Sequence, residues 1–77
     1  MKIVFTQHAL LQIKQRSLLK DQVTKTITAP DMVSLSYGFR EERYKKYGKL
    51  YMKVIVQEEV DKVLVITAHL VAKPKSK

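Results

Sequence analysis

The sequence contains no cysteine, only two glycines and two prolines, and no long apolar run. Without cysteine the chain can form neither a disulfide framework nor a thiolate metal site, and two histidines, His8 and His69, argue against a structural zinc cluster. No apolar stretch approaches the roughly 18 residues of a membrane span, and residues 1–5 are too short for the apolar core of a secretion signal. We therefore expect a soluble, unprocessed cytoplasmic protein with no metal, no cofactor and no membrane partner.

Glycine is also too scarce for a phosphate-binding loop. Gly38 and Gly48 stand alone, which argues against nucleotide binding of the P-loop or dinucleotide type. The glutamates at 41–42 and 58–59 are adjacent pairs, so in strands they would point to opposite faces. They form no carboxylate cluster, and any nuclease chemistry would have to be metal-independent.

The chain length and the charge limit the remaining classes. With 77 residues we expect one domain over residues 1–72 and a flexible basic tail over 73–77. Fifteen Lys and Arg against seven Asp and Glu give a net charge of +8. Such a charge favours phosphate polymers or an acidic protein partner, although it also suits a merely soluble basic surface. Twelve of the fifteen are lysines, which favours delocalised attraction over bidentate base reading.

The N-terminal half alternates between strand and helix signals. The pattern predicts a strand at residues 2–6, a helix at residues 7–16, and a second helix that begins at residue 18 or 19 and ends at residue 28. Thr6 is a suitable N-cap for the first helix, and Pro30 ends the second. Leu19, Val23 and Ile27 lie one turn apart, so we expect them on the buried side of the second helix.

From Asp31 the apolar period changes to two, as in strands. Gly38, the Gly48-Lys49 dipeptide and residues 59–61 supply the turn signals. The strands expected between them cover about 32–37, 42–47, 50–58 and 62–72. The predicted fold class is α+β: an N-terminal strand, a two-helix hairpin, and a four-stranded antiparallel β-meander with the helices on one face.

A three-residue turn at 59–61 and a two-residue turn at Gly48-Lys49 would set the strand register. One face is then apolar, with Val56, Val54, Met52 and Leu50 opposite Leu64, Ile66, Ala68 and Leu70. The other face pairs Ile55 with Val65, Lys53 with Thr67, Tyr51 with His69, Tyr44 with Lys53, and Lys46 with Tyr51. A one-residue shift would mix the two sets, which favours this register.

The polar face has two interpretations. Antiparallel sheets often leave one face solvated, and Tyr and Thr are ordinary there. Alternatively, the face binds nucleic acid by stacking bases on phenol rings and holding phosphates with ammonium groups. The nucleic-acid-binding candidates are Tyr44, Lys46, Tyr51, Thr67 and Arg16.

RNA cleavage through the 2′-hydroxyl needs a base, an acid and positive charge around the phosphate. His69 or His8 would serve as base or acid, and Lys53 and Arg43, with Lys46, would supply the charge. In the expected register Arg43 starts on the apolar side and would have to reach round the sheet edge. The catalytic candidates are therefore His69, Lys53, His8 and Arg43.

His8 and Arg16 stand eight residues apart in the first expected helix. They are separated by about 80° around the axis and roughly 12 Å along it, so they cannot act as an intimate pair. We interpret His8 chiefly as a structural residue that hydrogen-bonds to the last strands. Arg16, in the last turn, suits a partner for the helix C-terminus as well as a ligand for nucleic acid.

The chain resembles a prokaryotic domain family of unknown function that has an F-T-x-H-A motif. The segments that carry the resemblance are FTQHALLQIKQRSLLKDQV, ITAPDMV and VLVITAH. That family is related to the RelE/ParE superfamily of toxins and is similar to BrnT-like toxins. The resemblance covers about residues 3–69 and implies a strand, two helices and a twisted sheet whose uncovered face carries RNA-cleaving or ribosome-binding residues. By position, His8, Arg16 and Thr67 match the family pattern. Ser17, Leu19 and His69 depart from it, where a glycine, a capping Ser or Thr, and an aromatic residue are usual.

Three functions agree with these observations. The first is a toxin-like protein that binds RNA or the ribosome and cleaves RNA without metal, neutralised by an acidic antitoxin-like partner. The second is a non-catalytic module that binds nucleic acid or an acidic protein through the same face. The third is a small oligomeric protein, for example a homodimer joined through an edge strand, whose polar face is simply wet.

Overall fold

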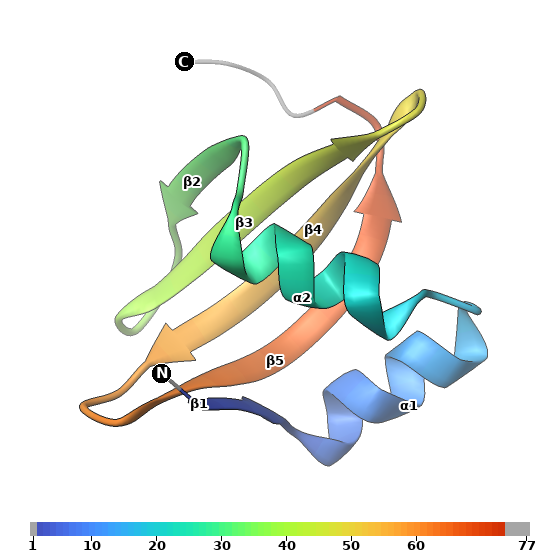
Figure 1. Cartoon of the computed structure of the whole chain (residues 1–77). Helices are drawn as coiled ribbons and strands as arrows, with labels where there is room; N and C mark the ends of the chain where they lie inside the picture. Colours follow the sequence, from blue (N-terminus) through green and yellow to red (C-terminus); the bar gives the residue numbers. More distant parts are fainter. Residues whose placement is uncertain (1, 74–77) are drawn as a thin grey trace.

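The fold is α+β, with two helices against a single five-stranded sheet (Figure 1). The computed structural model describes residues 2–73, so residues 74–77 of the expected basic tail lie outside them. The elements are β1 Lys2–Phe5, α1 Gln7–Gln15, α2 Lys20–Thr28, β2 Met32–Leu35, β3 Arg40–Tyr47, β4 Leu50–Glu58 and β5 Lys62–Val71.

The sheet has the strand order β1-β5-β4-β3-β2, and it is mixed rather than purely antiparallel. Strands β2 to β5 pair antiparallel with their sequence neighbours. Strand β1 joins the other edge and runs parallel to β5, with Ile3 opposite Val63 and Phe5 opposite Val65. The expected four-stranded antiparallel meander is therefore corrected to a five-stranded mixed sheet, because the N-terminal strand completes the β5 edge.

The helix boundaries follow local signals. Thr6 caps α1, since its side chain accepts a hydrogen bond from the Ala9 amide at 3.1 Å. Helix α2 begins after Leu19, which makes no side-chain cap bond, and ends before Pro30. The expected helix at 7–16 is confirmed to within one residue, and so is the end of the second helix.

Both helices cover the same face of the sheet (Figure 1). The core lies between them and the strands, and it consists of Ala9, Val23, Ile27, Met52, Val54, Val56, Val63, Val65 and Ala68. Val23 and Ile27 are buried as expected, but Leu19 is exposed. Leu19 precedes the first helical residue, so its backbone is extended and the helical spacing does not apply to it.

The β3–β4 register is confirmed, with Tyr44 opposite Lys53 and Lys46 opposite Tyr51. The turn between these strands places Gly48 at φ 63°, a left-handed conformation that glycine adopts without steric cost.

The β4–β5 register differs from the prediction. The Glu59 amide donates to the Lys62 carbonyl at 2.8 Å, so the connecting loop has two residues rather than three. A bulge then leaves Ile66 without an opposite residue, because Val56 pairs with Val65 whereas Ile55 pairs with Thr67.

The bulge changes which residues of β5 face the core: Val63 and Val65 do so before it, and Ala68 does so after it. Before it, Val65 packs in the core and Leu64 lies on the other face, which reverses the prediction. After it, Ala68 faces the core as expected. His69 consequently lies opposite Lys53, where Thr67 was expected.

Candidate nucleic-acid interface

The sheet face away from the helices, here called the open face, carries one row of polar side chains across three strands. Tyr44 in β3, Lys53 in β4 and His69 in β5 are directly opposite one another. Lys53 must point to the open face because its neighbours Met52 and Val54 are in the core. The Gly48 turn sets the first pair and the Ile66 bulge sets the second. We call Tyr44, Lys53 and His69 the cross-strand row.

Tyr44 is tied down at one end of the row. Its hydroxyl donates to Glu42 Oε1 at 2.8 Å, and Lys53 Nζ lies 3.9 Å from the same oxygen. Burial, the hydrogen bond to Glu42 and the Glu42 charge raise the pKa of Tyr44 to about 12. The residue is only 7% exposed, so its ring offers little surface on which a base could stack. Tyr44 therefore positions Glu42 and Lys53 rather than forming the expected stacking platform.

His69 stands at the other end of the row, opposite Lys53, and the Arg16 guanidinium donates to the carbonyl of the preceding residue, Ala68. Burial lowers the pKa of His69 from 6.5, and the charges of Lys53 and Arg16 lower it further. The uncharged form of the imidazole therefore predominates at pH 7. Its Nδ1 is buried and has no hydrogen-bond partner within residues 2–73. Such an unsatisfied polar atom is uncommon in a folded protein and draws attention to this position.

Arg16 reaches the row from the end of α1. Its Nη1 donates to the Ala68 carbonyl at 3.3 Å, next to His69. One turn earlier, Gln12 Oε1 accepts from the Ala68 amide at 3.0 Å and from the Thr67 hydroxyl. Helix α1 thus occupies the part of the β5 edge that β1 does not cover. Thr67, expected as a free contact for nucleic acid, has its hydroxyl engaged by Gln12.

Exposed lysines gather near the β3–β4 turn, where Asp31 pairs with Lys45 and Glu42 with Lys53. Lys46 and Lys49 are exposed near the β3–β4 turn, and the partly buried Tyr51 lies opposite Lys46. By contrast, Glu58, Glu59 and Asp61 gather at the β4–β5 turn, at the other end of β4. The cross-strand row lies on the basic side. We define the basic end of the open face as Arg16, Lys46, Lys49, Tyr51, Lys53 and His69.

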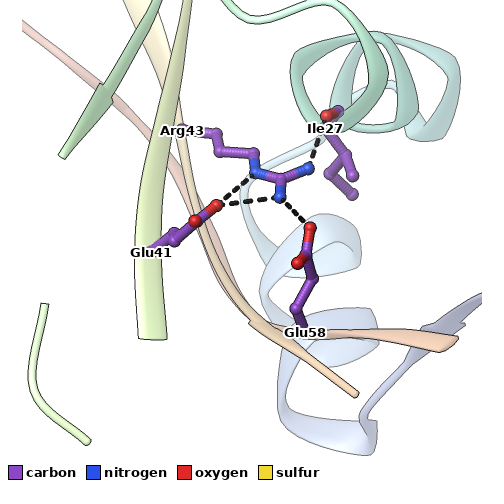
Figure 2. Close-up of polar contacts among 4 residues, drawn as sticks. All are labelled: Ile27, Glu41, Arg43 and Glu58. Atoms are coloured by element: carbon purple, nitrogen blue, oxygen red, sulfur yellow. Dashed lines mark hydrogen bonds and ion pairs between the residues drawn. The ribbon is translucent and has the colours of Figure 1, made fainter. Parts of the chain in front are cut away.

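Arg43, expected among the catalytic residues, lies on the helix-covered face. Figure 2 shows its guanidinium held from three directions. Nη1 donates to the Ile27 carbonyl at 2.8 Å, Nε and Nη2 donate to Glu41 at 3.0 and 2.8 Å, and Nη2 also donates to Glu58 at 2.9 Å. Arg43 clamps the last turn of α2 to the sheet. It does not join His69, because the sheet separates the two side chains.

His8 is exposed at the start of α1 and is also absent from the row. The link to the last strand that was expected of it is made by Thr6, whose hydroxyl and amide donate to the Val65 carbonyl at 2.8 and 3.1 Å. Of the catalytic candidates, the structure therefore brings together only His69 and Lys53.

Sequence reasoning missed two residues of this region, Gln12 and Glu42. Gln12 lies four positions before Arg16 and hence on the same helix stripe, a signal that could have identified it. Glu42 was recognised as pointing away from Glu41, but its contact with Tyr44 depends on how the side chains pack and has no sequence signal.

No group of three or more His, Asp or Glu side chains in the described part of the chain is arranged to hold a metal ion. The described helices are also too short and too polar to cross a membrane. Comparisons with family models, with curated proteins and with solved structures find no match for this chain.

Proposed function

We propose that this protein binds single-stranded RNA through the basic end of the open face. The observation that carries the proposal is the His69 imidazole, which has an unpartnered buried Nδ1, lies opposite Lys53 and is next to the Ala68 carbonyl bound by Arg16. Two cations lie near one uncharged hydrogen-bonding group, which suits a phosphate with an adjacent sugar hydroxyl.

The unpartnered ring nitrogen favours binding over chemistry. A buried N–H without a partner is rarer in proteins than a buried acceptor without one, so the proton of the neutral ring belongs on Nε2. Nε2 is then the hydrogen-bond donor of the ring. A donor near two cations binds a phosphate oxygen directly, whereas a general base would need the opposite tautomer.

Single-stranded RNA fits the surroundings of the row better than a duplex. Tyr51 lies two residues before Lys53 in β4, on the same face, and is partly exposed, so it offers more ring surface for stacking than the buried Tyr44 does. Lys46 and Lys49 continue the positive charge towards the β3–β4 turn. The order of strands and helices is also consistent with the proposed RelE/ParE-like relationship, in which ribosomal RNA would be the natural target and an acidic antitoxin-like protein would cover the same face.

Fluorescence anisotropy with a labelled single-stranded RNA tests the proposal. We expect binding that weakens with salt, and Arg16→Gln and Tyr51→Ala should each reduce the affinity. The matched control for the charge is Lys14→Gln, at an exposed lysine of α1, and it should leave the affinity unchanged. Equal losses for the site and control variants would mean that only bulk charge attracts RNA, and the proposal would fail.

Metal-independent RNA cleavage is the second candidate; it requires the tautomer of His69 that carries its proton on Nδ1, and one observation favours it. The lowered pKa of His69 keeps the imidazole uncharged near neutral pH, and Lys53 and Arg16 are placed to stabilise charge on a phosphate. Incubation with RNA in EDTA, with and without ribosomes, should yield 2′,3′-cyclic ends that disappear in His69→Gln. Intact RNA under all these conditions would eliminate cleavage while leaving the binding proposal in place.

A further inference from the structure

The β2–β3 hairpin carries an apolar surface that no helix covers. Val33 is 53% exposed, Leu35 86%, Tyr37 93% and Phe39 97%. Val33 and Leu35 lie opposite Arg43 and Glu41, so they point to the same side of the sheet as the helices, beyond the reach of α2. We call Val33, Leu35, Tyr37 and Phe39 the apolar edge. Grouped exposed side chains of this kind mark interaction sites more often than single ones do.

Phe39 is held in an unfavourable conformation. The hairpin turn has φ 62° at both Gly38 and Phe39, and the Arg40 amide donates to the Tyr37 carbonyl at 3.2 Å across it. Turns with two positive φ values normally use Gly or Asn, whereas a bulky aromatic residue there is strained. Because the ring is fully exposed, no contact within the described residues offsets this strain. Strain at an exposed side chain suggests a role outside the monomer.

The backbone of β2 is also available for pairing. Strand β2 is the last in the sheet, and Met32–Leu35 contains no charged residue and no proline, the usual protections of an exposed edge. The Ser36 amide donates inward to the Arg40 carbonyl at 2.9 Å. By alternation, Val33 and Leu35 turn their N–H and C=O groups outward.

We propose that β2 pairs antiparallel with β2 of a second copy of this chain, forming a twofold-symmetric dimer with a continuous ten-stranded sheet. With Ser34 opposite Ser34 of the second copy, Val33 lies opposite Leu35 and Leu35 opposite Val33. The four apolar side chains then meet on the helix side. This self-complementary register is what an isologous interface requires.

In the same register, a side chain of the second copy lies at a surface depression beside β2. A depression of about 340 Å³ is lined by Leu35, Ser36, Tyr37 and Glu42. Met32 of the second copy would lie opposite Ser36, at the mouth of this hollow. The hairpin tip, with Tyr37 and Phe39, would pass beside Pro30 and Asp31 of the second copy.

Charge and area favour a second copy over another partner. A different protein that binds a chain of net charge +8 would be acidic, and the basic end would attract it. Two copies of this chain repel each other where their lysines meet, and β2 is an edge strand without lysine. Aromatic side chains bury about 150–250 Å² each, so the apolar edge supplies about 500 Å² per copy. The total of about 1,000 Å² reaches the lower limit for a specific interface.

Analytical ultracentrifugation of the full chain over a range of concentrations tests the dimer. We expect a monomer–dimer equilibrium that Leu35→Lys abolishes. Phe39→Asn, which relaxes the turn, should raise the unfolding midpoint of the monomer while weakening dimerisation by about tenfold or more. Val60→Lys, at a fully exposed apolar residue in the remote β4–β5 turn, is the matched control and should leave the dimer intact.

Two results would overturn the inference: a wild-type chain that is monomeric at all concentrations, or a dimer that survives Leu35→Lys. A monomeric chain would leave β2 as a docking edge for a different protein. The result is independent of RNA binding, because the basic end and the apolar edge share no residue. Lys49→Gln, at an exposed residue of the basic end that does not line the hollow, should therefore leave the dimer unchanged.

Discussion

Replacing Lys53 by glutamine tests whether the basic end, rather than the total charge, binds RNA. The basic end contains four permanent cations, Arg16, Lys46, Lys49 and Lys53. If each neutralises one phosphate of a single strand, the logarithm of the association constant should fall with the logarithm of the salt concentration with a slope of about −2.8. Lys53→Gln removes one contact, so the slope should become about −2.1.

The loss in affinity follows from the same relation. One contact contributes about 0.7 logarithmic units at about 0.1 M salt, so Lys53→Gln should weaken binding about fivefold there. Lys25→Gln is the matched control, because it removes the same charge from the exposed surface of α2, on the helix side of the sheet.

The assay is a salt titration of RNA binding, followed by fluorescence anisotropy at about pH 7.5, where His69 is neutral. Unchanged slopes for Lys53→Gln, or an equal decrease for Lys25→Gln, would refute the reasoning. In the second case RNA would respond to the overall field of the protein and not to the cross-strand row.

Two further predictions concern stability. The pKa of His69 is lower in the folded chain than the value of 6.5 expected in the unfolded chain, so the unfolded chain binds more protons on acidification. The free energy of unfolding, measured with urea, should therefore decrease as the pH drops under about 6.5. His69→Gln should reduce this decrease. Arg43→Gln should cost about 2–3 kcal/mol, because the Arg43 side chain is 13% exposed and its loss leaves the Ile27 carbonyl and two carboxylates without their donor. Arg40→Gln, at an exposed position, should cost less than about 0.5 kcal/mol, and equal losses for the two variants would contradict the clamp.

Much of the candidate site was predictable where one turn determines the geometry. The Gly48 turn is short, so it places Tyr44 opposite Lys53 and Lys46 opposite Tyr51 without help from the rest of the chain. The β4–β5 turn carries no such signal. The loop has one residue fewer than predicted, and β5 has a bulge at Ile66. Together these two differences place His69 opposite Lys53, where Thr67 was predicted.

The sequence alone determined the α+β class, the ends of the helices at Thr6 and Pro30, and the pairing across Gly48. These depend on contacts between residues close together in the chain, and each has its own residue signature. The positive charge is likewise a property of composition.

The tertiary structure decided what long-range packing controls. Strand β1 lies beside β5, about sixty positions later in the chain, and no local pattern specifies that choice. Packing against α2 turned Arg43 into a clamp, and partial burial near Lys53 and Arg16 gave His69 its lowered pKa. Such environments arise only when distant segments meet, because burial and neighbouring charge belong to the folded state and not to any one stretch of sequence.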